Sequence, residues 1–279
     1  MNADHAYTTG ALYDLTGLTE SALLERVLAV VRSCGVMLQE ARSTLRQDQV
    51  SFKDRHNLVT TVDIRCEELL VQGLGEICSE IGFQTEEGVV ASQSTGWRWI
   101  IDPIDGTTNF VHGLPFFAIS VALAKDSDLF LGVVHAPCLD ELFVAVRGGG
   151  AFLNGRKIQV STQHSMEDAL LATGFPYYRF DRMEAYMEAL AEFMKTCRGI
   201  RRMGSAALDL AYVASGRFDA YFEHNLQPWD VAAGIVLVTE AGGRVGCIRE
   251  EYHPLDGREI VASGSELYQT FSKSLAGFR

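Results

Sequence analysis

The sequence has little of what marks a membrane or secreted protein. No apolar run approaches the roughly 20 residues that a membrane helix requires. The first residues, MNADHAYTTG, have neither a basic start nor an apolar run behind them, so they do not resemble a secretory signal. Proline is scarce, with six residues, and we find no repeat or low-complexity segment. These absences predict a cytoplasmic, globular chain with one large domain or two modest ones.

Cysteine pairs and a basic excess are also missing. The six cysteines are spread along the chain without a C-x-x-C pair, which favours reduced thiols over a disulfide or zinc framework. The 36 acidic residues outnumber the 24 basic ones, and the net charge is −12. We do not expect a nucleic-acid partner, because nucleic-acid binding requires a basic face. If the substrate is an anion, a metal ion would have to supply positive charge.

The first part of the chain has the pattern of helices followed by a mostly antiparallel sheet. Apolar residues recur at helical spacing over 20–42 and 64–80, and Thr19 is placed to cap the first of these helices. Asn154-Gly155 is a strong signal for a hairpin. The predicted strands lie at 116–123, 129–136, 141–146 and 151–160.

After about residue 160 the predicted helices and strands alternate. The strands are expected at 169–175, 217–223, 243–248 and 259–264, and the helices at 182–197, at 204–215 and after Trp229-Asp230. Such alternation indicates an α/β layered sandwich. We therefore predict an α+β domain over residues 1–160 and an α/β domain over 161–279, which share an interface.

The segment WIIDPIDGTTNF, residues 99–110, carries the clearest chemical signal. Asp102 and Asp105 follow an apolar strand, and a turn at Pro103 would let their carboxylates converge. With the carbonyl of Ile104 they would offer the oxygen ligands that Mg²⁺ prefers. The Gly-Thr-Thr that follows would present free backbone N–H groups to a phosphate. The alternative interpretation is a plain turn between a strand and a helix.

Two further segments place acids at the ends of apolar runs. FQTEEG, residues 83–88, ends in Glu86 and Glu87, and QPWDVAAG, residues 227–234, places Asp230 at a helix start. A solvated loop or helix N-terminus would explain the glutamates, since acids are favourable there. Asp230 could act as an N-cap and a metal ligand together, because each carboxylate oxygen can serve one role.

The three segments, in this order and spacing, resemble the inositol monophosphatase family. The resemblance runs from about Lys53 to beyond Gly243. It implies a layered αβαβα sandwich that is usually dimeric. It also implies hydrolysis of phosphate monoesters with Mg²⁺, two to three ions per site, and inhibition by Li⁺.

The resemblance also implies residue roles. Metal ions would be held by Glu86, Asp102, the Ile104 carbonyl, Asp105 and Asp230, with Asp102 shared. Asp63 and Thr107, with Glu86, would position and deprotonate the attacking water, and the turn of Gly106, Thr107 and Thr108 would grip the phosphate. Lys53 matches a lysine near the family's site, and Glu87 is a further candidate. A bound metal lowers the pKa of water, and a second stabilises the leaving oxygen.

The substrate is the open part of the prediction. In the family, hydroxyl groups are read at positions that correspond to Asp105, Ala206 and Glu223. Because a carboxylate can accept two hydroxyl hydrogen bonds, Glu223 favours an inositol monophosphate; a surface acid at a strand end is the alternative. This chain departs from the family in having Gly88 where a serine is frequent, and in Gln227, which varies.

Several alternatives stay open. Related enzymes act on histidinol phosphate, fructose 1,6-bisphosphate or 3′-phosphorylated nucleotides, and the last two would require extra cations near the mouth. The candidates for such cations are Arg179, Arg182, Arg201 and Arg202. Residues 175–182 would form a lid or a surface loop. A non-catalytic binding protein would be expected to lack a ligand acid, and a structural Ca²⁺ protein to have more ligands in one loop.

Overall fold

The computed structural model describes residues 15–44, 50–54, 57–175, 182–249, 251–275 and 277. The described elements are, in chain order, α2 (Glu20–Thr44), β1 (Val50–Asp54), β2 (Asn57–Thr60), α3 (Thr61–Gly75), β3 (Gly82–Thr85), β4 (Trp97–Asp105), α4 (Thr107–Val111), β5 (Ala118–Lys125), β6 (Asp128–Ala136), η2 (Pro137–Leu139), β7 (Glu141–Val146), β8 (Gly150–Leu153), β9 (Arg156–Lys157), β10 (Leu170–Thr173), α5 (Met183–Thr196), β11 (Gly199–Arg201), α6 (Ala206–Ala214), β12 (Ala220–His224), α7 (Pro228–Glu240), β13 (Gly243–Gly246), η3 (Pro254–Asp256), β14 (Glu259–Gly264) and α8 (Ser265–Ser274).

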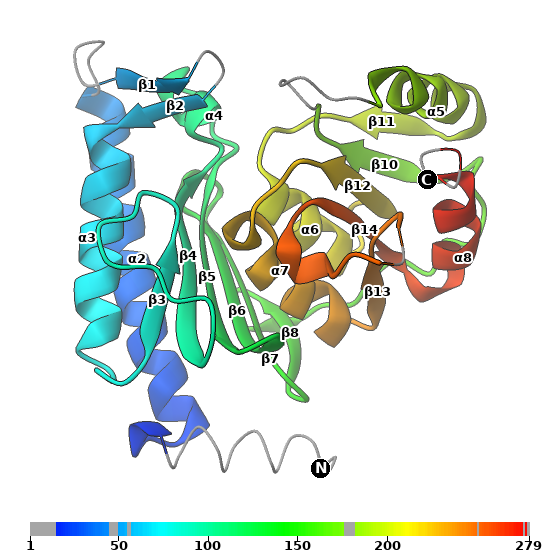
Figure 1. Ribbon diagram of the computed structural model, residues 1–279. Helices are drawn as coiled ribbons and strands as arrows, with labels where there is room; N and C mark the ends of the chain where they lie inside the picture. The colour runs from blue at the N-terminus through cyan, green and yellow to red at the C-terminus, as the bar shows by residue number, and fades with distance from the viewer. Residues whose placement is uncertain are drawn as a thin grey trace.

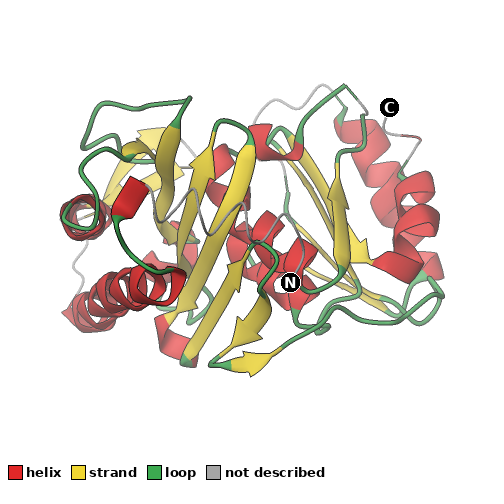
Figure 2. Ribbon diagram, turned by 90° about the horizontal axis from the view of Figure 1, so that it is seen from below, coloured by secondary structure: helices red, strands yellow, loops and turns green. Residues whose placement is uncertain are grey.

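The elements stack as five layers, helix–sheet–helix–sheet–helix (Figures 1 and 2). Helices α2 and α3 cover the outer face of the first sheet, α6 and α7 lie between the two sheets, and α5 and α8 cover the outer face of the second. Buried apolar side chains form three core clusters. One lies between the first sheet and helices α2 and α3, one surrounds the central helices α6 and α7, and one lies between the second sheet and helices α5 and α8. The predicted αβαβα sandwich is therefore confirmed.

The two sheets differ in strand direction. The first has seven strands in the order β3-β4-β5-β6-β7-β8-β9, and within it only the β3–β4 pair is parallel. The second has five strands in the order β11-β10-β12-β14-β13, with parallel and antiparallel pairs. The expected hairpin at Asn154-Gly155 joins β8 to β9, and both residues have positive φ, 48° and 76°.

The helices near the N-terminus follow from their apolar spacing. Leu23, Val27, Val31 and Leu38 of α2 are buried against the sheet, and the N–H of Ala22 donates to Oγ1 of Thr19 as an N-cap requires. Helix α3 ends at Gly75, earlier than the predicted residue 80.

Helix α3 begins with a capping box. The hydroxyl of Thr60 accepts from the N–H of Asp63, while the Asp63 carboxylate accepts from the N–H of Thr60 at 2.8 Å. Because the box pairs two otherwise unsatisfied N–H groups, it fixes the start of the helix and the Asp63 side chain together.

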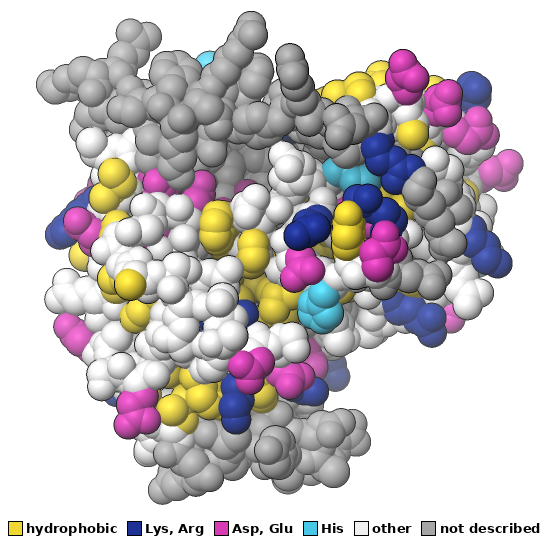
Figure 3. Space-filling view, viewed as in Figure 1, with side chains coloured by type: hydrophobic (Ala, Val, Ile, Leu, Met, Phe, Trp, Pro, Cys, Tyr) yellow, Lys and Arg dark blue, Asp and Glu magenta, His cyan; other side chains and the backbone are white. Residues whose placement is uncertain are grey.

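Several described elements were not predicted. The hairpin of β1 and β2 and the short β11 have too few residues to show a period, and α8 follows β14 without an intervening turn signal. None of the described helices has both the length and the hydropathy needed to cross a membrane. Acidic and basic side chains are interspersed over the described part of the face in Figure 3.

Helix α7 packs against both sheets. It contacts strands of the first sheet on one side and β13 and β14 of the second on the other. Gly132 in β6 allows this approach, because a Cβ at that position would lie 2.5 Å from the carbonyl oxygen of Ala233. The division into domains at residue 160 stays a proposal, since α7 follows that point in sequence yet covers the sheet before it.

Candidate metal and phosphate site

A β-bulge brings Asp102 and Asp105 to the same side of β4. In a regular strand, side chains three residues apart point to opposite faces. Here Asp102 is opposite Ser120 and Asp105 is opposite Ala118, so β4 has one more residue than β5 in this interval. The prediction of a turn between the two acids was therefore wrong. The chain stays in the strand, and the bulge brings the Asp105 side chain to the same side as that of Asp102.

Asp230 enters the site from the first turn of α7. The N-cap is Gln227, whose N–H donates to Oδ2 of Asp230 at 2.7 Å, and Pro228 occupies the first helical position. The prediction that Asp230 itself is the N-cap is thus corrected: it is the third helical residue and closes the cap from inside. One carboxylate oxygen makes this bond, and the other remains for a ligand.

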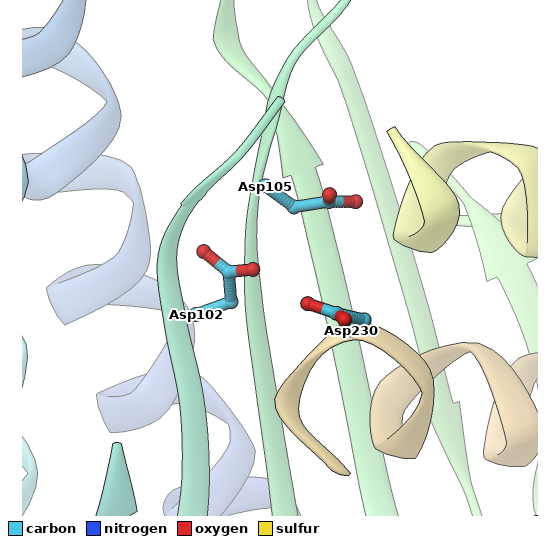
Figure 4. A group of neighbouring side chains, drawn as sticks. All are labelled: Asp102, Asp105 and Asp230. Atoms are coloured by element: carbon cyan, nitrogen blue, oxygen red, sulfur yellow. The ribbon is translucent and has the colours of Figure 1, made fainter. Parts of the chain in front are cut away.

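The carboxylates of Asp102, Asp105 and Asp230 face one another (Figure 4). Ligand atoms from the three residues all lie within 4.8 Å of one another. Asp102 and Asp105 are 2% and 9% exposed, so water screens their charges poorly. A backbone N–H from Ile104 donates to Oδ1 of Asp102 at 2.9 Å and holds that side chain in place.

Glu86 lies beside this cluster. Strand β3 runs parallel to β4 with Thr85 opposite Ile101, and the N–H of Glu86 donates to the Ile101 carbonyl at 3.3 Å. The buried carboxylate of Glu67 in α3 accepts from the N–H groups of Glu87 and Val89, at 2.7 and 2.9 Å. Glu67 was not predicted, although an acid on the apolar face of a predicted helix is a signal for such a role.

The acids of the site repel one another. Burial raises the pKa of Asp102 well above its ordinary value, and the negative charges of Glu86, Asp105 and Asp230 raise it further. Burial and like charges raise the pKa of Asp230 in the same way. The pKa of Asp105 rises to about 6, chiefly through burial. A bound cation would relieve this repulsion, since it favours the ionised form of each acid.

The donor set fits a hard divalent cation. Every side-chain ligand in the cluster of three is a carboxylate oxygen, and oxygen-only sites suit Mg²⁺, Ca²⁺ or Mn²⁺ rather than softer metals. The carbonyl of Ile104 lies in the bulge between two of these acids and is a further candidate ligand. These residues could therefore hold a divalent ion.

Thr107 links this carbonyl to the start of α3. Its hydroxyl lies 3.1 Å from Oδ1 of Asp63 and 3.0 Å from the carbonyl oxygen of Ile104. The single hydroxyl proton can be donated to only one of them at a time. Burial raises the pKa of Asp63, although the hydrogen bonds from Thr60 oppose the rise. A fully buried carboxylate with a hydroxyl between it and the metal site is suited to proton transfer.

The turn after Asp105 requires glycine. Gly106 has φ of 96° and is the N-cap of α4, and a Cβ there would lie 3.0 Å from the carbonyl oxygen of Gly204. Thr107 is half-buried, and Thr108 is exposed on the first turn of the helix. The predicted phosphate turn thus adjoins the acids, as the sequence order requires.

The C-terminal half supplies further residues that contact the site. Oδ2 of Asp105 accepts from the hydroxyl of Ser205 at 2.7 Å and from the N–H of Ala207 at 2.6 Å. Ala206, the predicted residue, lies between these two donors. Glu223 in β12 accepts from the hydroxyl of Tyr221 at 2.5 Å. Ser205 and Tyr221 were not predicted.

The remaining candidates are placed as follows. Lys53 lies in β1, but its side chain is outside the described part of the structure, and so are Arg179 and residues 176–181 of the segment proposed as a lid. Arg201 is exposed and donates to the carbonyl of Ile200 at 3.0 Å. The guanidinium carbon of Arg202 lies 5.7 Å from the ring centroid of Phe175.

Known proteins resemble this chain along most of its length. The Inositol monophosphatase family matches residues 20–276. An inositol-1-monophosphatase of Rhizobium meliloti (strain 1021) is 41% identical over 251 residues, which cover 90% of this chain and 94% of the relative. A Nus factor SuhB of Pseudomonas aeruginosa is 39% identical over 252 residues, covering 88% and 93%. The crystal structure of extragenic suppressor protein suhB from Bartonella henselae has a TM-score of 0.86 at 38% identity, covering 91% and 98%.

Proposed function

This chain belongs to the inositol monophosphatase family, and from that membership we propose that it is a Mg²⁺-dependent phosphate monoester hydrolase acting on inositol monophosphate. The observation that carries the proposal is the convergence of Asp102, Asp105 and Asp230 within 4.8 Å, next to a glycine-threonine turn. Family resemblance further favours two to three Mg²⁺ ions, inhibition by Li⁺, a homodimer and a cytoplasmic location.

Each group has a proposed role in the reaction. Asp102, Asp105 and Asp230, with Glu86 and the Ile104 carbonyl, hold the metal ions. Bound Mg²⁺ supplies positive charge to the phosphate and acidifies water. The N–H groups of the 106–108 turn bind the phosphate oxygens.

Thr107 and Asp63 handle the proton. When the hydroxyl of Thr107 donates to Asp63, its oxygen lone pairs face away and can accept a hydrogen bond from the attacking water. The water proton then passes by way of Thr107 to the buried carboxylate of Asp63. Attack in line with the leaving alcohol requires that water and phosphate be held together, which is the main work of such a site.

Glu223 and Asp105 support the inositol substrate. Both carboxylates are fixed by donors from the protein and keep free lone pairs for the hydroxyl groups of a polyol. Asp105, Ala206 and Glu223 would therefore bind the alcohol, on the opposite side of the phosphate from Thr107. The alternatives within the family are histidinol phosphate, fructose 1,6-bisphosphate and 3′-phosphorylated nucleotides.

A non-catalytic role is the second candidate. It is favoured by the relative named Nus factor SuhB, which is almost as similar to this chain as the relative named inositol-1-monophosphatase. The two functions are compatible, because a binding surface need not overlap the acid cluster. All four proposed acidic ligands are present, which favours the enzyme.

The test is release of inorganic phosphate, with and without Mg²⁺, from inositol 1-phosphate, histidinol phosphate, fructose 1,6-bisphosphate and a 3′-phosphorylated nucleotide. We expect the fastest turnover with inositol 1-phosphate, dependent on Mg²⁺. Asp102→Asn removes one charged ligand and keeps nearly the same side-chain volume. We expect the rate to fall about 10³-fold or more, because the loss of a single strong electrostatic contact in an active site has an effect of at least this order.

The outcomes separate the candidates. Preference for another ester would retain the hydrolase and overturn the substrate. An Asp102→Asn variant with most of its activity would contradict the shared-ligand role. No release from any ester in the presence of Mg²⁺ would leave the non-catalytic candidate.

A further inference from the structure

Ser120 is a buried polar residue in a row of alanines on β5. Ala118, Ala122 and Ala124 belong to the core cluster around the central helices. Ser120 lies on the same face of the strand, because side chains two residues apart point the same way, and it is 1% exposed. Burial of a hydroxyl group is unfavourable unless the group is hydrogen-bonded. Since the other positions of this row are alanine, packing alone does not explain the hydroxyl.

The hydroxyl of Ser120 bonds the helix that supplies the third acid of the cluster. It donates to the carbonyl oxygen of Trp229 at 3.1 Å. Trp229 is the second residue of α7 and directly precedes Asp230. The bond from the N–H of Gln227 holds the Asp230 side chain to its own helix. The Ser120 bond, by contrast, holds the first turn of that helix to the first sheet.

Ser120 is also the cross-strand neighbour of Asp102. Strands β4 and β5 are antiparallel, and Asp102 lies opposite Ser120 in their register. Residues in this relation share a face of the sheet, with Cβ atoms roughly 4.5–5.5 Å apart. Ile100, two residues before Asp102, belongs to the core cluster around the central helices, as expected for this face. Ser120 is therefore next to Asp102 on the sheet and bonded to the residue before Asp230 on the helix.

The separation of the Asp102 and Asp230 carboxylates depends on how α7 lies against the sheet. The two acids come from different elements, and their ligand atoms lie within 4.8 Å of each other. Mg²⁺ requires near-octahedral geometry with ligands at roughly 2.0–2.1 Å, so a small shift of the helix would weaken its binding. Residues that hold the ligands of a metal in place typically contribute about 10–100-fold to its affinity or to activity.

We propose that Ser120 is a positioning residue of the metal site, whose bond to Trp229 sets the separation of the Asp102 and Asp230 carboxylates. The inference rests on the proposed function, because the divalent ion is part of it. Ser120 acts through the position of α7 and is not itself a ligand. Its loss should therefore weaken metal binding more than it slows the enzyme once metal is saturating.

The test is the affinity for Mg²⁺ of Ser120→Ala and of wild type, measured by calorimetry without substrate. The substitution removes the hydroxyl and gives the residue type of the rest of the row. We expect the Kd for Mg²⁺ to rise about tenfold, as for other residues that hold metal ligands. With inositol 1-phosphate, the Mg²⁺ concentration at half-maximal turnover should rise by a similar factor, whereas kcat at saturating Mg²⁺ should change little.

Ser263→Ala is the matched control. Ser263 is fully buried in β14, and its hydroxyl donates to the carbonyl oxygen of Gly264 at 3.0 Å. The same chemical change there should leave the affinity for Mg²⁺ unchanged. Without divalent ions, the thermal midpoints of the two variants should be close, because each loses one neutral hydrogen bond. A difference in Mg²⁺ affinity between them then comes from the position of the bond.

Three results would overturn the proposal. Equal Mg²⁺ affinity of Ser120→Ala and wild type would show that the bond does not position the ligands. An equal loss of affinity in Ser263→Ala would mean that any buried hydroxyl has the same effect. A lower kcat with unchanged Mg²⁺ affinity would place Ser120 in the chemical step.

The proposed function fails in a different way. If wild type does not bind Mg²⁺, the metal site fails, and the inference fails with it. If wild type binds Mg²⁺ but releases phosphate from no ester, the hydrolase fails, and the calorimetric comparison of the variants still decides the role of Ser120.

Discussion

Substitutions at Thr107 test how much a single hydroxyl group of the site contributes to catalysis. Thr107→Val removes the oxygen that lies 3.1 Å from Asp63 and 3.0 Å from the Ile104 carbonyl, while the branched shape is kept. We expect kcat to fall about 10²-fold or more, in the range of lost acid–base catalysis. Thr107→Ser keeps the hydroxyl and should stay within about tenfold of wild type. Steady-state kinetics with both variants decides the point, and near-normal activity of the valine variant would refute the role.

The pH dependence of stability provides a second residue-scale prediction. In the folded protein Glu223 keeps its proton up to a pH of about 7, whereas its ordinary pKa is 4.5. Between these values the unfolded chain binds fewer protons, so the free energy of unfolding falls as pH rises. In wild type without divalent ions we expect this loss to reach up to about 3 kcal/mol by pH 7.5.

A matched variant isolates this loss. Glu223→Gln cannot ionise, so its free energy of unfolding should exceed that of wild type at pH 7.5 and not at pH 4. His224 acts in the opposite direction, because its pKa is lowered to about 4 by burial and nearby arginines, and its contribution is lost as pH falls below 6.5. Since His224 is present in both proteins, denaturant titrations at several pH values cancel it. A pH-independent difference would contradict the prediction.

Some site residues are visible in the sequence and others are not. Asp102, Asp105 and Asp230 stand out because each follows or begins an apolar element, where an acid is costly without a partner. Glu67 gives only a weak signal, as an acid on the apolar face of a predicted helix, and Arg202 is one of four candidate cations. Each lies among residues of similar charge, and only the folded chain shows which of these acids and cations face the site.

At the scale of elements, the contact between β6 and α7 leaves no space for a side chain at Gly132. Gly132→Ala would place a methyl group 2.5 Å from the Ala233 carbonyl and 3.0 Å from Cβ of Val236. We expect a loss of about 1–3 kcal/mol in the free energy of unfolding, because the backbone on one side must move. Chemical denaturation would measure it.

Gly75→Ala is the matched control. Gly75 ends α3, and the nearest heavy atom to its Cβ position is 3.9 Å away. This change should leave stability equal or raise it by up to about 1 kcal/mol, since alanine favours a helix. Equal effects of the two substitutions would mean that β6 and α7 are not closely packed.

Element types were predicted better than their detailed geometry. The apolar period of 20–42 and the Asn154-Gly155 pair suffice for a helix and a hairpin, because both signals are local. The bulge in β4 depends on its pairing with β5, a contact between distant residues. The sequence alone therefore suggested a turn at Pro103, where the folded chain has a strand.

For the whole molecule, the bonds between its halves predict a single unfolding transition. Glu141 in β7 pairs with Arg217 at 2.6 Å and accepts from the Tyr212 hydroxyl at 2.9 Å. Glu240 of α7 accepts from the N–H groups of Gly148 and Gly150. We expect one peak in scanning calorimetry. Two separated peaks would show that residues 1–160 and 161–279 unfold independently, and would contradict the shared interface that the sequence predicts.

The layered architecture also sets the order in which the site is completed during synthesis. Asp102 and Asp105 leave the ribosome well before Ser205, Ala207 and Asp230, which complete the arrangement from the later half. A nascent chain thus has a partial ligand set while it is being translated. At the proposed metal site, full affinity for a divalent ion would require that α7 has docked, so metal loading would report on completion of folding.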